Sequence, residues 1–201
     1  MQNTFLILLL IAVLAPVAFS ATAGVPPELE STEFSKSDIT PCPACLCAAP
    51  TGELFVGVDL LGSLGKGPGK GRIVRLIDTD NDGVADKHSV FAKVDNPRGL
   101  ISVGTKLWVL HTVIPESTGK LTGMHVSLFE DKDWDGIADG RGKILLSNVS
   151  PPKHNQDRGA DHTTNGFRLG IDGWIYIAVG DFGIHGARGI DGTELTMLGG
   201  G

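Results

Sequence analysis

Two acidic segments of the same design constrain the fold of this chain more than any other feature. The first, DTDNDGVAD at residues 78–86, has the pattern Asp-x-Asp-x-Asp-Gly-x-x-Asp. The second, DKDWDGIAD at residues 131–139, repeats that pattern after 53 residues (131 minus 78). A run of strand-forming residues precedes and follows each segment. The chain is therefore expected to repeat one unit: strand, acidic turn, strand.

The spacing of this repeat predicts an all-β fold of the β-propeller class. Propeller blades have about four antiparallel strands, and all-β repeats of about 40–50 residues are typical of them. Closed propellers have about four to eight blades, so the 201 residues hold a partial propeller, with about three to four blades. The predicted strands cover residues 53–59, 71–78, 89–94, 99–104, 106–113, 124–131, 143–149, 166–171 and 174–181, and Asp172-Gly173 predicts a two-residue hairpin loop between the last two.

Residues 1–23 are typical of a secretory signal peptide. Phe5 to Leu14 form an apolar run that is too short to cross a bilayer as a helix, and small residues follow it. No Lys or Arg precedes this run, which leaves an uncleaved anchor as the alternative. Residues 24–40 are predicted to be an extended entry segment, and residues 41–201 the N-terminal part of a truncated propeller. We expect an exported protein, periplasmic or extracellular, with no membrane span after leader cleavage.

Charge and cysteine content argue against several other classes. The formal net charge of −6 gives no electrostatic reason to expect a nucleic acid partner. The glycine-rich segment at residues 61–72 lacks the register of a phosphate-binding loop. Cys42, Cys45 and Cys47 have no second cysteine pair or histidine at zinc-site spacing. We therefore expect buried thiols or one local disulfide.

Each acidic segment is predicted to bind calcium. Carboxylates at alternate positions of a tight turn converge, and like charges about 4 Å apart repel by roughly 4 kcal/mol near a protein surface. Calcium accepts about 6–8 oxygen ligands and removes this repulsion. Strands rather than helices flank the loops, so they are not EF-hands; the alternative is a solvated acidic turn that binds nothing. The predicted ligands are Asp78, Asp80, Asp82, the Val84 carbonyl and Asp86 in the first loop, and Asp131, Asp133, Asp135, the Ile137 carbonyl and Asp139 in the second.

A polar stretch at residues 151–165 is the candidate chemical site, because it leads directly into a predicted hairpin. Asp161 and His162 are neighbours, and on an extended segment their side chains would point to opposite sides. If a bend brings them together, the carboxylate would raise the basicity of His162 and make it a general base. The alternatives are a structural loop histidine and, together with His154, a zinc ligand.

The segment DH…NGFRLGIDGWIYIAVGD resembles the glucose/sorbosone dehydrogenase family of β-propellers. In that family a catalytic histidine precedes a glycine and a motif of the form lxfGpDGxlYvxxGD. The order of GRIVRLIDTDNDGVAD, VFAKVDNPRGL and KLWVLHT is similar to a secreted branch found beside haem-binding domains in planctomycete-type proteins, and the resemblance covers most of residues 40–201. The matching positions are His162, Gly166, Leu169, Gly170, Asp172, Gly173, Tyr176, Gly180 and Asp181, and Asp161 matches the acid before the histidine.

The resemblance implies an enzyme that oxidises a sugar or alcohol. His162 would take the hydroxyl proton while a hydride passes to pyrroloquinoline quinone, and Asp161 would orient the base or the substrate. The family's residues that grip this cofactor come from later blades, so this part alone is expected to be inactive. A haem protein or cytochrome would be the redox partner. The alternative is a non-catalytic, calcium-binding propeller that acts as an interaction module attached to a redox or haem domain.

Overall fold

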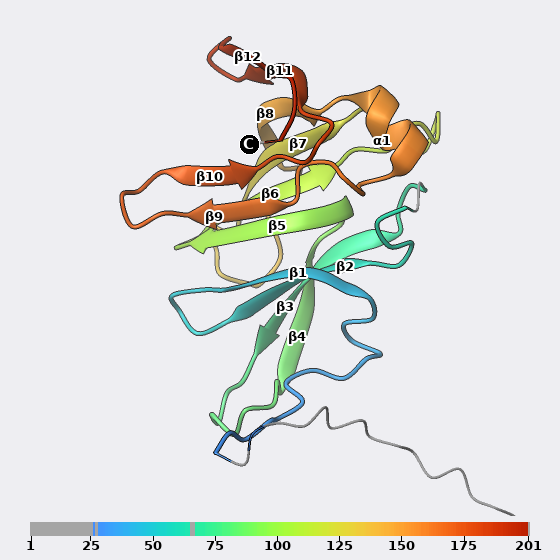
Figure 1. The fold of residues 1–201 in the computed structure, drawn as a ribbon. Helices are drawn as coiled ribbons and strands as arrows, with labels where there is room; N and C mark the ends of the chain where they lie inside the picture. Colours follow the sequence, from blue (N-terminus) through green and yellow to red (C-terminus); the bar gives the residue numbers. More distant parts are fainter. Residues whose placement is uncertain (1–25, 27, 65–66, 201) are drawn as a thin grey trace, which may run out of the picture. The chain divides into compact units, whose positions relative to one another are not determined.

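The computed structural model describes residue 26 and residues 28–64 and 67–200 (Figure 1). The signal peptide predicted at residues 1–23 lies outside the described residues and stays a prediction. The chain divides into two units, residues 1–31 and 32–201. In the first unit, the amide of Leu29 donates a 2.9 Å hydrogen bond to the carbonyl of Pro26. The second unit contains the sheets.

The second unit begins with two successive four-stranded antiparallel meanders, in which each strand pairs with the next along the chain (Figure 1). Each meander carries its acidic loop between its third and fourth strands, as the repeat predicted. The first sheet consists of β1 (Pro43–Ala48), β2 (Leu54–Asp59), β3 (Gly71–Ile77) and β4 (Lys87–Ala92). The second consists of β5 (Asp95–Val103), β6 (Lys106–Thr112), β7 (Met124–Glu130) and β8 (Lys143–Ser150).

The remaining strands do not form a third four-stranded meander. β9 (Gly166–Leu169) and β10 (Ile175–Ala178) form a separate hairpin, whereas β11 (Ile184–Gly189) and β12 (Glu194–Met197) extend the second sheet beyond β8. The register pairs Arg188 of β11 with Ser147 of β8. The described residues therefore form an all-β, antiparallel fold without a closed ring.

Two local predictions differ from the structure. The polar stretch after β8 begins with a short helix, α1 (Pro152–Arg158), although no helix was expected there. The β9–β10 loop is longer than a two-residue turn, because the amide of Gly170 bonds to the carbonyl of Trp174 at 2.7 Å. A two-residue type I′ turn needs positive φ at both central residues, and here Gly173 has a φ of 83° while Asp172 is not in the positive region.

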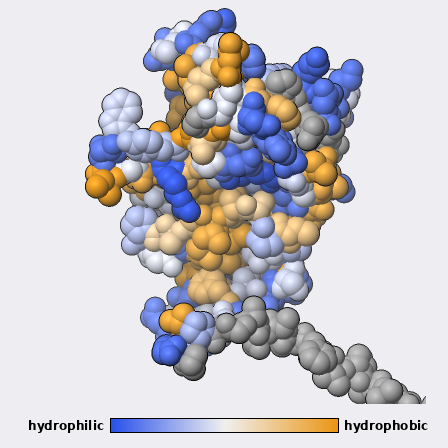
Figure 2. All heavy atoms as spheres, viewed as in Figure 1, coloured by the Kyte–Doolittle hydropathy of each residue, from blue (hydrophilic) through white to orange (hydrophobic). Residues whose placement is uncertain are grey.

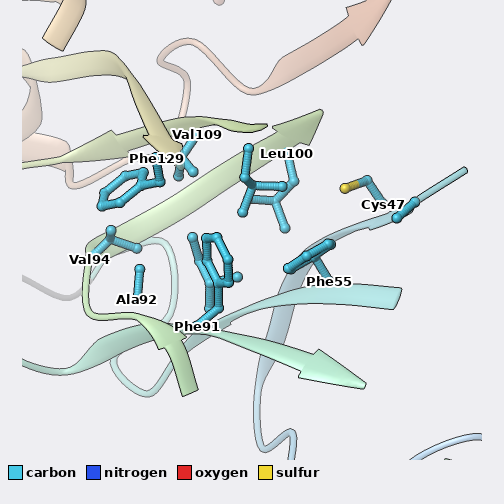
Figure 3. Packing of buried hydrophobic residues seen from close by; sticks show 11 residues of the cluster. Cys47, Phe55, Phe91, Ala92, Val94, Leu100, Val109 and Phe129 are labelled. Carbon is cyan, nitrogen blue, oxygen red and sulfur yellow. The ribbon is translucent and has the colours of Figure 1, made fainter. Parts of the chain in front are cut away.

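The main core lies between the two meanders. Phe55 and Phe91 of the first sheet pack edge to face, with ring centroids 5.1 Å apart. Figure 3 shows Leu100, Val109 and Phe129 of the second sheet close to these two rings. Burial of such large apolar side chains contributes roughly 1.5–3 kcal/mol each. This packing joins the two acidic-loop units into one body.

Apolar side chains are also exposed at the tip of the β9–β10 hairpin, where Figure 2 shows an orange patch. Ile171 and Trp174 lie in this connection, and Trp174 is 73% exposed. The rest of the hairpin contacts the second sheet through β9 and β5. At Gly99 of β5, an added Cβ would lie 2.4 Å from the Cβ of Phe167 in β9, so the two strands pack with no room for a side chain at this glycine.

Candidate metal centres and a histidine–aspartate pair

The two acidic loops share one backbone design. Both have a glycine with positive φ at the sixth position, 88° at Gly83 and 86° at Gly136. Two residues earlier, Asn81 and Trp134 also have positive φ, at 61° and 62°. Glycine adopts this region without steric cost, whereas tryptophan does so with strain. Two different sequences are thus folded into the same loop.

The first aspartate of each loop accepts the amide of this sixth-position glycine. The distance is 2.9 Å from the Gly83 amide to Asp78 Oδ2 and 3.0 Å from the Gly136 amide to Asp131 Oδ2. Asp78 accepts a second amide, that of Asn81, on its Oδ1 at 2.7 Å. In both loops the glycine bond fixes one carboxylate oxygen, and so it also directs the other one.

The last aspartate of each loop closes the turn. Asp86 Oδ2 accepts the amide of Thr79 at 2.7 Å, and Asp139 Oδ2 accepts the amide of Lys132 at 2.6 Å. The bonds from the amide and hydroxyl of Thr79 lower the pKa of Asp86, which therefore stays ionised. This aspartate is held as an anion beside the other carboxylates of its loop.

Each loop brings three carboxylates together. One oxygen from each member of a triad lies within 4.8 Å of the corresponding oxygens of the other two, so each triad can hold a metal ion such as calcium. The two triads occupy identical positions in the repeat. They are Asp78, Asp80 and Asp86 in the first loop and Asp131, Asp133 and Asp139 in the second.

Charge repulsion inside the first triad is visible at its middle member. The amide of Asp82 bonds to Asp80 and by itself lowers the pKa of this carboxyl. The negative charges of Asp82, Asp86 and Asp78 outweigh that bond, so the pKa of Asp80 lies above its ordinary value. A bound divalent cation would reverse this effect, because an opposite charge favours the ionised form.

Asp131 has the most informative environment of the six carboxylates. The residue is only 5% exposed. Oδ2 takes the Gly136 amide, whereas Oδ1 is buried without a hydrogen-bond partner. Leaving a buried polar group without a hydrogen-bond partner costs roughly 1–3 kcal/mol for a neutral group. The cost is larger for a charged group such as a carboxylate. A cation in the triad would supply the missing partner.

The two predicted ligands at the fifth position lie outside the triads. Asp82 Oδ1 accepts the amide of Val84 at 2.8 Å, and Asp135 Oδ1 accepts the amide of Ile137 at 2.8 Å. The carboxylates that were expected to bind metal thus form hydrogen bonds that shape the turn. Direct ligation by Asp82, Asp135 and the carbonyls of Val84 and Ile137 stays a prediction.

The second loop also contacts the first sheet. The amide of Ala138 donates to the carbonyl of Phe91 in β4 at 2.9 Å, and Ser89 Oγ donates to the carbonyl of Gly136 at 2.7 Å. In the first loop, the amide of Ala85 donates to the carbonyl of Phe34 at 2.8 Å. Each loop is therefore attached to the segment that precedes its own sheet.

His162 lies in an open hollow at the base of the β9–β10 hairpin. Its Nδ1 is 3.0 Å from Asp181 Oδ1, and its Nε2 is 3.6 Å from Asp161 Oδ2. The side chain of His162 is 49% exposed. Other residues that line the hollow, of about 420 Å³, include Thr163, Asn165, Val179 and Gly180. The structure thus places Asp161 and His162 together, as the bend hypothesis required.

No role was predicted for Asp181 from the sequence. It follows Gly180 at the end of the motif that resembles the dehydrogenase family, and that position was its only signal. Gly180 itself approaches the His162 backbone: an added Cβ would lie 2.1 Å from the carbonyl oxygen of His162. His162 has a φ of 57°, in the left-handed region that few residues other than glycine adopt. The close approach and the unusual φ hold the imidazole beside Asp181.

The three cysteines differ in exposure. All three are free, with Cys42 exposed and Cys47 buried. Burial raises the pKa of Cys45 to about 12 and that of Cys47 to about 11, so neither forms a thiolate at neutral pH. Of the two alternatives from sequence, the structure has free thiols rather than a disulfide: Cys45 is partly buried and Cys47 is buried. Among the described residues, the groups able to hold a metal are the aspartate triads, and no histidine belongs to them.

Fold and site define an all-β protein with two antiparallel meanders and a candidate cation site in each. The chain belongs to the DUF7133 family, a domain of unknown function whose family model matches residues 25–196. No curated protein matches the chain. Nor does any helix among the described residues have the length and apolar character to cross a membrane.

One solved structure with a match is the hydrazine synthase of Kuenenia stuttgartiensis. The sequence identity is 18% and the TM-score 0.40, and the match covers 68% of this chain. The match spans 37% of the length of the hydrazine synthase chain.

Proposed function

We propose that this domain is a calcium-binding module whose two ions fix the hairpins of two propeller-type blades. In each blade the ion would lie between the third and fourth strands, held by the loop's triad. The ion would neutralise the repulsion between carboxylates and fix the loop that contacts the preceding segment. Calcium-binding modules in an extracytoplasmic setting have dissociation constants of about 10⁻⁴–10⁻³ M, and we expect affinities in this range.

The observation that carries the proposal is the state of Asp131. A carboxylate oxygen that is buried and unpartnered, beside two further carboxylates, is unfavourable without a cation. A solvated acidic turn, the competing explanation, would leave all its carboxylate oxygens in water. That explanation fits Asp80, which is exposed, but not Asp131.

Isothermal titration calorimetry with calcium tests this function. The full chain should take up two ions. Asp80→Asn and Asp133→Asn keep the shape of the side chain while removing one charged ligand from the first and second triads. Each should remove or strongly weaken one binding event, and the double variant should remove both.

A matched control is Asp38→Asn, because Asp38 is an exposed acid outside both triads. Its titration should equal that of the unchanged protein. If the unchanged protein gives no heat, the calcium function is wrong. If Asp38→Asn weakens uptake as much as Asp133→Asn, general acidity rather than the triads explains the binding.

A second candidate function is supported by the contact between His162 and Asp181. We propose that this domain belongs to an extracytoplasmic sugar or alcohol dehydrogenase and that the His162–Asp181 pair serves its chemistry. The imidazole would accept the proton of a substrate hydroxyl, and Asp181 would stabilise the imidazolium that forms. Asp161, 3.6 Å from the other ring nitrogen, would position the ring or the substrate.

The described hollow does not fit pyrroloquinoline quinone by itself. A quinone that carries carboxylates is held by cations such as Arg and Lys, and the residues that line the described hollow include neither. No step through the quinone is therefore derived from it. The cations that would hold it have to come from residues outside this hollow.

Dye reduction by full-length protein that includes the later blades, with added quinone and a panel of aldoses and alcohols, tests the enzymatic candidate. His162→Ala should lower turnover by about 10²–10⁴-fold, the usual contribution of a positioned base. Asp181→Asn should lower turnover less and shift its pH dependence. Full turnover by His162→Ala would remove the catalytic role and favour the interaction module, which would be attached to a haem or cytochrome redox partner.

A further inference from the structure

The first sheet has an apolar face that a segment before β1 covers. Val56 and Val58 of β2 and Val74 and Leu76 of β3 form a buried cluster on this face. Phe34 and Ile39 pack against this cluster from the segment Thr32–Thr40, which we call the strap. The strap has no strand of its own, and it belongs to the same unit as the sheets.

The strap stands in the same relation to the first acidic loop as β4 does to the second. The Ala85 amide bonds to the carbonyl of Phe34, and the equivalent Ala138 amide bonds to the carbonyl of Phe91. The residues two places earlier correspond as well. Thr32 is the side chain nearest to the Cβ position of Gly83, at 3.6 Å, and Ser89 lies 3.1 Å from that of Gly136.

This correspondence shows that the strap contacts the first loop as an outer strand contacts the second. Phe34 and Phe91 follow Thr32 and Ser89 by the same two residues, so both pairs present the same carbonyl and the same side-chain position to a loop. The strap thus takes the place, on the first sheet, that the outer strand of a neighbouring sheet takes on the second. The difference is support: β4 is also paired with β3, whereas the strap is not part of any described sheet.

The strap depends on few contacts. Besides its bond to Ala85, the strap accepts a hydrogen bond from Arg72 at the carbonyl of Ile39. At 3.5 Å this bond is at the upper limit of length. Phe34 and Ile39 are only partly buried. Segments with few buried contacts open locally at a lower free energy than the strands beneath them. The loop that presents the Ala85 amide therefore matters for whether the strap stays closed.

We propose that cation binding at the first acidic loop latches the strap onto the first sheet, an inference that rests on the proposed calcium function. Asp78 and Asp86 bracket the Gly83–Ala85 backbone, so drawing their carboxylates together fixes the amide that Phe34 accepts. Loss of the ion restores the repulsion among the acids, loosens this backbone and releases the strap. Release uncovers the apolar face of β2 and β3.

Limited trypsin digestion of the full chain measures this latch. Lys36 is the first Lys or Arg in the sequence and is exposed in the strap, so cleavage after it gives a fragment that begins at Ser37. The rate at Lys36 should rise by about tenfold when EGTA replaces calcium, as expected for coupling between a site and a local opening. The rate is divided by that of a peptide substrate in the same buffer, because calcium also affects trypsin.

Matched variants separate the two loops. Asp80→Asn should be cleaved as fast in calcium as the unchanged protein is in EGTA. Asp133→Asn alters the second loop only, and it should keep the slow, calcium-dependent cleavage at Lys36.

Calorimetry on the same samples distinguishes failure of the latch from failure of the calcium function. If calcium binds at the first loop and the rate at Lys36 does not change, the latch is wrong and the calcium function stands. If Asp133→Asn speeds cleavage as much as Asp80→Asn, control by the first loop is wrong. If no calcium binds, both proposals fall.

Discussion

The main-chain amide of Ala138 donates a 2.9 Å hydrogen bond to the carbonyl of Phe91, which lies in a different sheet. One side of this contact is an acidic loop and the other is the last strand of the preceding meander. The ring of Phe91 enters the core between the sheets, where it meets Phe55. A single residue thus links the candidate cation loop to the packing of the two meanders.

Phe91→Ala should destabilise the domain by about 3–5 kcal/mol, the usual cost of removing a buried aromatic ring. Phe91 is 2% exposed, so the variant leaves a cavity between the sheets. Its backbone carbonyl remains, so the effect reports the ring. Urea unfolding measures the change, with Val90→Ala as the control, because Val90 is adjacent and 43% exposed. A loss no larger than that of the control would contradict the assignment of Phe91 to the main core.

The two loop glycines provide a matched pair. Replacement of either by Ala forces a side chain into the positive-φ region, which costs about 1–2 kcal/mol. At Gly136 the new Cβ would also lie 2.4 Å from Arg75 Nη1, whereas at Gly83 the nearest atom is 3.6 Å away. Gly136→Ala should therefore lower the free energy of unfolding more than Gly83→Ala. Equal losses would mean that Arg75 moves aside without cost.

Acidification should destabilise the protein through His111. Burial lowers the pKa of His111 to about 4, below the ordinary 6.5. Its Nδ1 donates to the carbonyl of Thr112 at 2.7 Å, so in the neutral ring Nε2 accepts from Ser127 Oγ at 2.9 Å. Between these two pKa values the unfolded chain binds more protons than the folded one, and the free energy of unfolding falls as the pH falls.

This loss should reach roughly 3 kcal/mol on going from pH 7 to pH 4. Urea unfolding across that range checks it. His111→Gln should show a shallower pH dependence than the unchanged protein, although it is less stable at pH 7. His88→Gln is the control, because His88 is exposed. If the His111→Gln and wild-type profiles are parallel, burial of a neutral imidazole does not cause the acid sensitivity.

Much of the fold follows from the sequence because the repeat is local. Each strand of β2 to β10 was expected from apolar runs bounded by turn residues, and the acidic loops lie in the predicted hairpins. β11 was missed because HGARG carries little β-propensity, and it is held instead by pairing with β8. α1 was missed because seven residues are too few for a helical period to appear.

The candidate site was predictable by residue type but not by assignment. Spacing predicted five ligands in each loop. The structure gathers three of the carboxylates, while Asp82 and Asp135 bond to backbone amides and their ligation stays a prediction. Side-chain direction in a turn depends on the φ of each residue, which spacing does not give. The contact of Asp181 with His162 could not be predicted for a different reason. The two residues are far apart in sequence, and the β9–β10 hairpin brings them together.

Terbium luminescence excited through Trp134 is a direct test of metal binding at the second acidic loop. Trp134 lies between Asp133 and Asp135 in the second loop, and the first loop has Asn81 at that position, so sensitised emission reports one site alone. We expect emission that saturates with terbium, is displaced by calcium, disappears in Asp133→Asn and persists in Asp80→Asn. Absence of emission from the unchanged protein, or emission that survives Asp133→Asn, would contradict a metal centre at Asp131, Asp133 and Asp139.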